Sequence, residues 1–415
     1  MRAAASSVSV INLSEDIQPA STSNSTASIQ LQNITENEFP QVLAYVVLEN
    51  GLKVAEYYNE EEGINETSLH LSYSVAKSWI SLLIGMLEGM GNVSLNETLI
   101  DIWPDESNQI WPQVNNSTYR QQITVEDLLT MTSGCDDPPV SYGMEALQEG
   151  IMGGTNLTEV LNYPQCLESN ITNANDEFQY LNDNILSYII LERSGMPPQD
   201  FAAEYLMPFL GMDNGTWEWL QNLDGVAYAS AGLSTTTMNY AKFGQLYLQN
   251  GFASESKQLV PRDWIERSTT GHIDISPDDP FRDLFRIDPN MTLSYGYRFW
   301  VFNDDDEKEE EEENLYCAFG AGGHYICVWP LLARVLSVNV APANGTNNWL
   351  GYEFLDLVGG LQFASDERMD DEKDAEDLAS SSSSSSSSAS PAWEKSLSTF
   401  LVLAAMIAHL CSTVI

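Results

Sequence analysis

The spacing of apolar residues is typical of β-strands toward both ends of the chain and of helices in between. Residues 41–58 form a mostly apolar run interrupted by Asn50-Gly51, a dipeptide that favours the positive φ angles of a hairpin turn. From Tyr73 to Met90 apolar residues recur at helical spacing, which is typical of a buried helix. The pattern therefore predicts a β-hairpin followed by a buried helix.

The rest of the chain completes this arrangement. Further helices are predicted at residues 124–130, 184–194, 200–209 and 237–250, and a closing helix at 348–363. Strands are predicted at residues 294–303, 314–319, 325–329 and 335–340. Strands at both ends with helices between them indicate an α+β sandwich, whose antiparallel sheet joins N- and C-terminal segments and is flanked by helices. A mostly helical subdomain is expected as an insertion at about residues 96–290.

The first buried helix carries a single charge. Lys77 is the only charged residue between Leu71 and Leu87. Ser74 precedes it by three positions, so the two side chains share a helix face and can meet within hydrogen-bond reach. Burial favours the neutral amine of a lysine, and a neutral amine can take a proton from a serine hydroxyl. Ser74 and Lys77 are therefore candidates for an activated nucleophile and its base.

Two observations weigh against this reading of the Ser-x-x-Lys pattern alone. The pattern recurs at Ser254 and Lys257, in a polar stretch predicted to be a loop. A buried lysine can also extend its amine to the surface without a catalytic role. The first copy differs from the second because Ser74 opens an apolar helix, whose N-terminal N–H groups could stabilise an oxyanion.

A second candidate group precedes the predicted helix at residues 184–194. Tyr180 and Asn182 lie two positions apart at this loop-to-helix junction, where they could offer a phenol and an amide to one pocket. The same Tyr-x-Asn spacing occurs at Tyr57 and Asn59, and a lone tyrosine is more often a core residue. Only the order of motifs along the chain favours Tyr180.

Together these motifs resemble the serine β-lactamase and penicillin-binding-protein superfamily, specifically the class C β-lactamase-like esterases and amide hydrolases. The resemblance spans about residues 41–363 and adds several longer motifs in the same order. They are LSYSVAKS at 71–78, ITVEDLLTMTSG at 123–134, MPFLGM at 207–212, AGLSTT at 231–236, YAKFG at 240–244 and YGYRFW at 295–300. The resemblance implies a β-lactamase/transpeptidase-like sandwich and needs no cofactor.

The resemblance also implies roles for individual residues. Ser74 would be acylated, Lys77 would share or remove its proton, and Tyr180 would be the partner base and the proton donor to the leaving group. Asn182 matches the asparagine that orients substrate and lysine.

The third family element lies at residues 318–325. There the backbone N–H of Ala321, next to Gly320, would complete the oxyanion hole with that of Ser74. This element departs from the family, because Ala318 stands where β-lactamases carry a cation and His324 where many relatives carry glutamine. His324 is a candidate substrate-binding residue or an ordinary strand histidine.

The composition narrows the possible functions. The 415 residues include 17 Lys and Arg against 60 Asp and Glu, a formal net charge of −43, so nucleic-acid binding is not expected. Acidic runs at residues 304–313 and 366–377 lack the spacing of an EF-hand and are expected to be loop and linker. Outside the C-terminal tail the histidines are His70, His272 and His324. So few histidines make a histidine-based catalytic triad or a zinc site an unfavourable prediction.

Sequons and cysteines indicate a secretory protein. Thirteen Asn-x-Ser/Thr sequons occur, of which the glycosylation candidates are Asn65, Asn92, Asn96, Asn116, Asn156, Asn170, Asn214, Asn290 and Asn344. Four body cysteines allow three pairings. In an oxidising compartment we favour Cys135 with Cys166 and Cys317 with Cys327, with buried free thiols as the alternative.

The ends of the chain differ from its centre. We expect four segments: a polar disordered segment at 1–38, a hydrolase domain at 39–365, an acidic, serine-rich stalk with a GPI-attachment region at 366–396, and a hydrophobic tail at 397–415. Small residues, a spacer and an apolar tail are typical of a GPI signal. The expected location is the outer face of the plasma membrane, with a single-pass anchor as the alternative.

The sequence thus predicts a cell-surface serine hydrolase that cleaves ester or amide bonds of small molecules or peptides through an acyl-enzyme. One alternative is a non-catalytic binding or scaffold protein that keeps the fold. The other is a penicillin-recognising peptidase or β-lactamase.

Overall fold

A computed structural model describes residues 8–21, 25–104, 121–133, 183–222, 224–303, 315–341 and 349–363. Its central element is an eight-stranded sheet whose order is β2-β1-β13-β12-β11-β10-β9-β8. Every neighbouring pair in it is antiparallel. The strands are β1 (Val42–Glu49), β2 (Leu52–Tyr58), β8 (Ile273–Asp274), β9 (Thr292–Tyr295), β10 (Trp300–Asn303), β11 (Leu315–Gly320), β12 (His324–Trp329) and β13 (Arg334–Val340). N- and C-terminal strands therefore share one sheet, as the sequence predicted.

The hairpin that forms one edge of this sheet is also confirmed. Its turn residues Asn50 and Gly51 have φ angles of 52° and 78°, the left-handed conformation that such turns require. Gly51 is also sterically required, because a Cβ there would lie 2.7 Å from the Ile11 side chain.

The prediction of one strand at residues 294–303 was wrong. The segment forms two strands, β9 and β10, joined by a turn in which Arg298 has a φ of 68°. Gly296 bonds to Phe299 across the turn, and a Cβ on Gly296 would lie 2.3 Å from the carbonyl oxygen of Ser268. The apolar side chains on both sides of the turn face the core, so the hydrophobic pattern gave no sign of the break.

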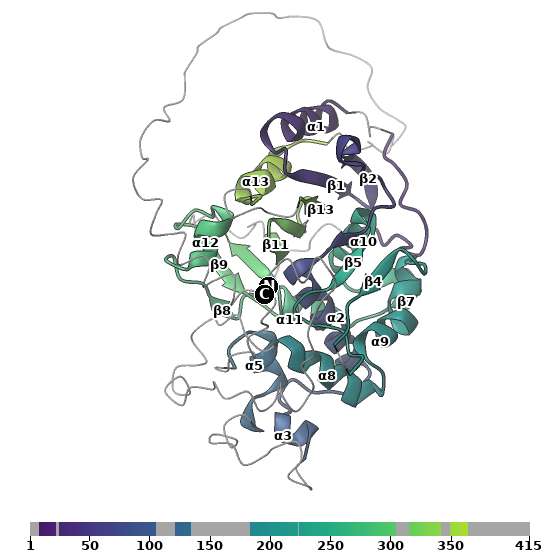
Figure 1. Ribbon diagram of the computed structural model, residues 1–415, viewed down its shortest axis with the longest axis vertical. Coiled ribbons are helices and arrows are strands. Elements are labelled where there is room, and N and C mark those ends of the chain that lie inside the picture. Colours follow the sequence, from purple (N-terminus) through teal and green to yellow (C-terminus); the bar gives the residue numbers. More distant parts are fainter. Residues whose placement is uncertain are drawn as a thin grey trace, which may run out of the picture.

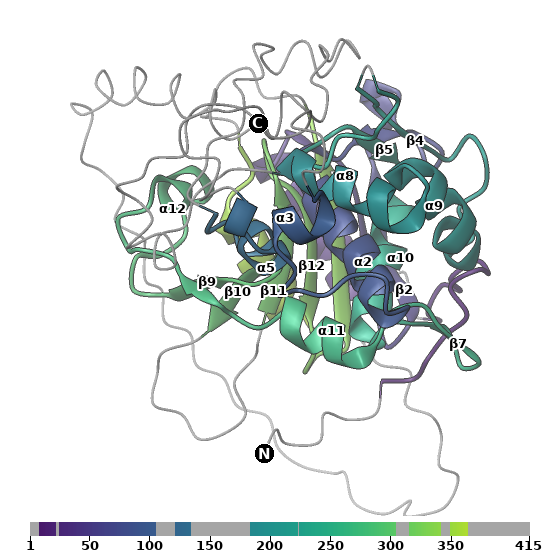
Figure 2. The ribbon, with the colours of Figure 1, turned by 90° about the horizontal axis from the view of Figure 1, so that it is seen from below.

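Helices cover both faces of the sheet, because alternate side chains of each strand point to opposite faces. In β13, Val335 packs in one buried cluster and Leu336 in the other. The first cluster holds α2 (Ala76–Gly89), α3 (Leu99–Ile102), α5 (Val125–Leu129), α8 (Asp183–Ser194), α9 (Pro198–Tyr205), α10 (Thr237–Leu248) and α11 (Arg262–Ser268). The second holds α1 (Thr26–Glu38), α12 (Pro280–Phe285) and α13 (Tyr352–Gly360). Figure 1 shows α1 and α13 on the other side of the sheet from α5 and α8, and in Figure 2 helices of the first cluster lie in front of the strands.

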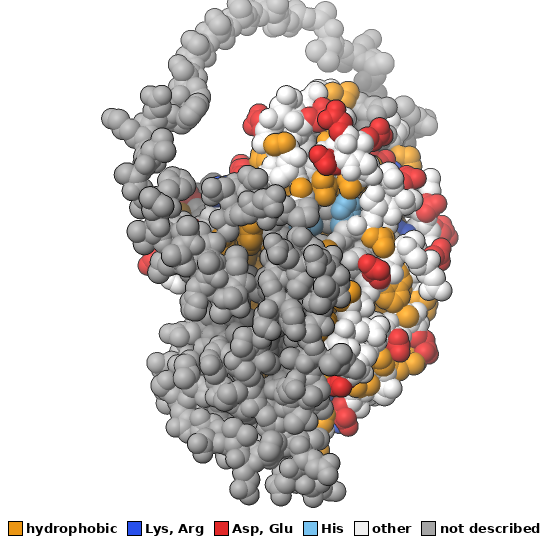
Figure 3. All heavy atoms as spheres, viewed as in Figure 1, with side chains coloured by type: hydrophobic (Ala, Val, Ile, Leu, Met, Phe, Trp, Pro, Cys, Tyr) orange, Lys and Arg blue, Asp and Glu red, His pale blue; other side chains and the backbone are white. Residues whose placement is uncertain are grey.

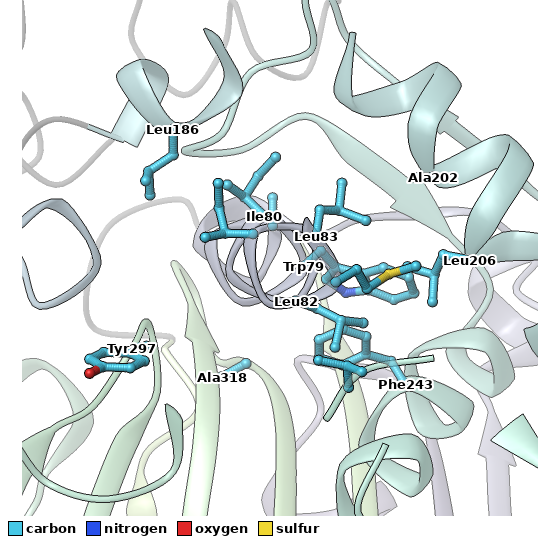
Figure 4. Packing of buried hydrophobic residues seen from close by; sticks show 14 of the residues in the cluster. Trp79, Ile80, Leu82, Leu83, Leu186, Ala202, Leu206, Phe243, Tyr297 and Ala318 are labelled. Atoms are coloured by element: carbon cyan, nitrogen blue, oxygen red, sulfur yellow. The ribbon is translucent and has the colours of Figure 1, made fainter. Parts of the chain in front are cut away.

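The helix α2 is the centre of the first cluster. Trp79, on α2, stacks on Phe243 of α10 with ring centroids 4.2 Å apart (Figure 4). Gly85 allows the other close contact, because a Cβ there would lie 2.4 Å from the Trp264 ring of α11. The helix is therefore fixed by neighbours on two sides.

The chain between β2 and β8 contains more strand than the sequence indicated. A small sheet has the order β3-β5-β4, formed by β3 (His70–Leu71), β5 (Leu233–Thr235) and β4 (Trp217–Trp219). A short hairpin of β6 (Phe252–Ser254) and β7 (Lys257–Gln258) holds the second Ser-x-x-Lys copy. Strands of two or three residues are too short for a visible alternation, which explains why they were missed.

We expected residues 1–38 to be a polar disordered segment, but two parts of this segment are ordered in the structure. Residues 25–38 form α1 and its cap, in which Ser28 N donates to Ser25 Oγ at 3.2 Å. Residues 8–21 lie along the sheet edge and α10, with hydrogen bonds from Leu13 N to Ala253 O and from Ala20 N to Lys53 O. A few well-separated apolar residues, among them Leu31, enter the core, which an average composition does not reveal.

The predicted Cys317–Cys327 disulfide is present and joins β11 to β12 at directly paired positions. Cys135 and Cys166 lie outside the described residues, as do residues 366–396 and the tail at 397–415. Among the helices that the structure describes, none combines the length and apolar character of a membrane span.

Candidate active site

Ser74 lies on a sharp turn between β3 and α2. A 3-10 helix at Tyr73–Val75 leads directly into α2. Tyr73 has a φ of 47°, a left-handed conformation that costs a non-glycine residue about 1 kcal/mol or more. Ser72 N bonds to Leu233 O at 2.7 Å, which ties the turn to the small sheet. The strained turn leaves the Ser74 side chain only partly buried at the start of the helix.

The structure brings Ser74 and Lys77 together. Lys77 Nζ lies 3.0 Å from Ser74 Oγ and also donates to the backbone carbonyl of Ser230 at 3.3 Å. The lysine side chain extends along the buried side of α2, and the residue is only 8% exposed. A serine hydroxyl and an amine at this distance can exchange a proton.

Ser230 was not identified from the sequence, because it contributes a backbone carbonyl and so leaves no residue-type signal. Its loop is fixed by two buried amides. Gln199 Nε2 donates to Gly225 O, and Gln199 Oε1 accepts from Ala227 N. Asn184 Oδ1 accepts from Ala229 N at 3.2 Å. Helices α8 and α9 therefore position the carbonyl that contacts Lys77.

The third sequence element, at the β11–β12 turn, packs against the nucleophile turn. A Cβ on Gly320 would lie 2.6 Å from Ser72 O, so only glycine allows this approach. Ala321, the predicted oxyanion donor, follows at the end of β11. Gly322 and Gly323 then turn the chain with φ angles of 82° and 100°. Leu350 N holds this turn by donating to Gly322 O at 2.9 Å.

His324 begins β12 behind the nucleophile turn. Its ring centroid lies 4.8 Å from that of Tyr73, and its Nδ1 accepts from Asn339 Nδ2 at 3.3 Å. Burial lowers the pKa of His324 to about 3, with a smaller contribution from His70, and burial lowers the pKa of His70 to about 4. Both histidines are therefore neutral near pH 7. Histidine atoms are visible between hydrophobic atoms on the face shown in Figure 3.

Two further serines on α2 anchor the helix that carries Lys77. Ser78 Oγ donates to Arg298 O at 2.6 Å, and Ser81 Oγ donates to Tyr297 O at 2.8 Å. The β9–β10 turn that the sequence did not reveal thus supplies the acceptors.

Other predicted site residues are placed differently. Tyr180 and Asn182 lie outside the described residues, and α8 begins at Asp183 beside the loop that contacts Lys77. The second Ser-x-x-Lys copy, Ser254 to Lys257, lies on the β6–β7 hairpin, where Lys257 is exposed. Of the glycosylation candidates, the described ones are all exposed: Asn65, Asn92, Asn96, Asn214 and Asn290. Asn116, Asn156, Asn170 and Asn344 lie outside the described residues.

Within the part of the chain that the structure describes, no three His, Cys, Asp or Glu side chains are grouped so that they could hold a metal ion.

Comparison with known families matches the Beta-lactamase family model to residues 31–341. The chain belongs to the β-lactamase family. A curated member, the 6-aminohexanoate-dimer hydrolase of Paenarthrobacter ureafaciens, is 24% identical over 235 residues. The aligned region covers 55% of this chain and 57% of that hydrolase, so the match spans little more than half of its length.

Solved structures of this β-lactamase-family fold align over most of the chain. A penicillin-binding protein homologue from Caulobacter crescentus gives a TM-score of 0.57 at 12% identity, covering 82% of this chain and 99% of that one. EstCE1, described as a hydrolase with promiscuous acyltransferase activity, gives 0.59 at 14% identity, covering 81% and 99%. The family match confirms the predicted family, and the structural matches confirm the predicted α+β fold.

Proposed function

We propose that this β-lactamase-family chain is a serine hydrolase that cleaves ester or amide bonds of small molecules or peptides through an acyl-enzyme. The observation that carries the proposal is the 3.0 Å contact between Ser74 Oγ and Lys77 Nζ at the start of a buried helix. The family match supports the reaction class, and the likeness to an enzyme named for an amide substrate supports amides among the substrates.

The geometry suggests the following sequence of steps. Lys77 takes the hydroxyl proton of Ser74 while Oγ attacks the carbonyl carbon of the substrate. The oxygen of the tetrahedral intermediate accepts hydrogen bonds from the backbone N–H groups of Ser74 and Ala321. Collapse of the intermediate breaks the ester or amide bond, and the proton held by Lys77 passes by way of Tyr180 to the leaving alcohol or amine. Water then attacks the acyl carbon and the bond from that carbon to Ser74 Oγ breaks. The proton lost by the water returns through Lys77 to Oγ, and the carboxylic acid product leaves.

We assign the transfer of the proton to the leaving group to Tyr180, and the orientation of substrate and lysine to Asn182. Both roles rest on the match between their motif and that of the family. Two observations support these roles. The motifs occur along the chain in the family's order, and α8, which begins directly after Asn182, contacts the loop whose Ser230 carbonyl accepts from Lys77.

β-Lactamases carry a cationic side chain on the strand that corresponds to β11, and it binds the carboxylate of the substrate. The substrates of this chain should not need such a carboxylate. Ala318 occupies the position of that cation, and it is fully buried against α2 (Figure 4). A methyl group supplies neither charge nor hydrogen bonds to a substrate carboxylate. Penicillins and cephalosporins should therefore be hydrolysed slowly or not at all.

The test is covalent labelling by a fluorophosphonate, followed by assays with short-chain p-nitrophenyl esters, the matching anilides and nitrocefin. The wild type should be labelled once and should cleave the esters, while Ser74→Ala should show neither reaction. Ser254→Ala is the matched control, because it removes the serine of the other Ser-x-x-Lys copy. Labelling of the Ser74→Ala variant would remove the nucleophile assignment.

The same assays separate the alternatives. An unreactive wild type would favour a binding or scaffold protein. A turnover of nitrocefin comparable with that of the esters would favour a penicillin-recognising enzyme and would contradict the argument from Ala318.

A further inference from the structure

The strained backbone of Tyr73 needs a support. A tyrosine with a φ of 47° persists only where its surroundings hold it. Ser74 and Lys77 both follow Tyr73 on one helical run. A relaxation of this angle would therefore keep their spacing and rotate the start of the helix relative to the β11–β12 turn. The groups that contact Tyr73 therefore control how the backbone N–H of Ser74 faces that of Ala321, the two proposed oxyanion donors.

The ring of His324 packs against the Tyr73 ring. Their ring centroids are 4.8 Å apart with planes at 50°, and both residues are 4% exposed. The backbone of His324 is fixed as well, because it follows the Gly322–Gly323 turn. A Cβ on Gly323 would lie 2.4 Å from the Leu350 side chain, so the turn has little room to move.

A directed chain of hydrogen bonds fixes the ring of His324. Thr237 Oγ1 donates to Asn339 Oδ1 at 2.9 Å, and Asn339 Nδ2 donates to His324 Nδ1 at 3.3 Å. All three side chains are buried. Because an amide nitrogen only donates, Nδ1 is the acceptor and the ring proton lies on Nε2. Thr237 and Asn339 thus select one tautomer and one ring orientation.

The surroundings also keep this imidazole uncharged. Burial disfavours the imidazolium, and the nearby His70 disfavours it further, so the pKa of His324 falls to about 3. A ring that stays neutral throughout the working pH range is suited to hold a shape and not to exchange protons.

We propose that His324 is a positioning residue for Ser74, in which the Thr237–Asn339–His324 chain braces Tyr73 and thereby fixes the backbone N–H of Ser74 relative to that of Ala321. This inference rests on the proposed role of Ser74 as nucleophile. It assigns no contact between His324 and the substrate.

Three variants and a control test the brace by fluorophosphonate labelling and by ester hydrolysis from pH 5 to 9. His324→Ala should slow labelling and reduce kcat by about 10- to 100-fold, with KM within about threefold. Asn339→Leu should give a smaller loss, because the ring remains but can turn. His324→Gln should stay within about threefold of wild type, since its amide oxygen can accept from Asn339. His272→Ala removes an exposed histidine and should leave the rate unchanged.

The pH profile separates positioning from proton transfer. The acid limb should keep its midpoint in every active variant, whereas loss or displacement of that limb in His324→Gln would overturn the positioning role. A His324→Ala variant that is labelled at the wild-type rate would also overturn it.

A crystal structure gives a readout that does not depend on turnover. In His324→Ala, or in Asn339→Leu if the first variant does not fold, the φ of Tyr73 should relax and the distance between the backbone nitrogens of Ser74 and Ala321 should change from its wild-type value. An unchanged distance and an unchanged φ at Tyr73 would overturn the inference even if the wild type were inactive. Failure of the proposed function itself would instead appear as labelling that survives Ser74→Ala.

Discussion

Two buried lysines lie on helices that pack against each other, and their surroundings differ. Lys77 on α2 is 8% exposed, and Lys242 on α10 is 4% exposed. The helices meet through the stacked rings of Trp79 and Phe243. Lys77 contacts a serine hydroxyl and a loop carbonyl. Lys242 donates to Leu210 O at 3.1 Å, and the nearby carboxylates of Asp16 and Asp213 favour its charged form.

The difference shows that burial of a lysine does not by itself mark a catalytic group. Burial lowers the pKa of Lys242, yet its partner is a backbone carbonyl that can only accept a hydrogen bond. Lys77 contacts the hydroxyl of Ser74 on a strained turn. The end of β11 packs closely against this turn at Gly320. A lysine that can take part in catalysis is therefore distinguished by the group that its amine contacts, here a hydroxyl, and not by how deeply the amine is buried. A lysine that contacts only a backbone carbonyl links two segments of the chain.

The sharpest way to break this comparison is to replace each lysine by methionine, which keeps most of the volume and removes the amine. Lys77→Met should reduce ester hydrolysis by about 10² to 10⁴, because the Ser74 proton loses its acceptor. Lys242→Met should keep the rate within about threefold. Rates should be measured per folded molecule, with thermal unfolding of both variants as the control.

Equal losses of activity in the two methionine variants would contradict the assignment of separate roles. Equal retention would remove Lys77 from the mechanism while leaving Ser74 to be tested alone.

The contact between Lys77 and Ser74 could be predicted from the sequence because it is local. A three-residue spacing on one helix places Ser74 and Lys77 together whatever the rest of the chain does. The Asn50-Gly51 hairpin and the Cys317–Cys327 disulfide are local in the same sense. Each depends on residues that lie a few positions apart, or on two neighbouring strands.

The rest of the site depends on pairs that are distant in the sequence. The Thr237–Asn339 contact joins residues 102 positions apart, and the Lys77–Ser230 contact joins residues 153 apart. No periodicity encodes such pairs. The same cause explains the error at the N-terminus, where Leu13 is held by Ala253. The roles of Tyr180 and Asn182 and the Cys135–Cys166 pairing stay predictions.

Lys242 should matter for stability where Lys77 matters for rate. Lys242→Ala removes the buried stem and leaves Leu210 O without this donor, so we expect a loss of about 2–3 kcal/mol in unfolding free energy. It should also loosen residues 8–21, because the Lys242 amine lies near Ser14 and Asp16. Urea unfolding measures the first effect, and hydrogen exchange at Leu13 and Ala20 measures the second.

A Lys242→Ala variant with unchanged stability and unchanged exchange at Leu13 would show that this lysine does not tie the N-terminal segment down. A parallel measurement on Arg262→Ala, an exposed side chain in a surface ion pair, provides the baseline for a charge that should contribute less than about 1 kcal/mol.

The two regions should also differ in how stability depends on pH, because neutral histidines lie behind the Ser74 turn while carboxylates lie near Lys242. The pKa values of His70 and His324 are lowered from 6.5 to about 4 and about 3. As the pH falls below 6.5, the unfolded chain binds protons that the native chain does not, so acid favours unfolding. Each histidine should remove about 1.4 kcal/mol of stability for every pH unit between 6 and 4.

Urea unfolding of the wild type and of His70→Gln at pH 7, 6, 5 and 4.5 isolates this effect from the titration of the many carboxylates, which both proteins share. The variant should lose stability less steeply below pH 6, by about one proton in the slope of unfolding free energy against pH. His272→Gln should follow the wild type, since His272 is exposed. Parallel curves for wild type and His70→Gln would mean that His70 is protonated in the native protein at these pH values. The region behind Ser74 would then resemble the charged surroundings of Lys242, and the contrast between the two sites would be lost.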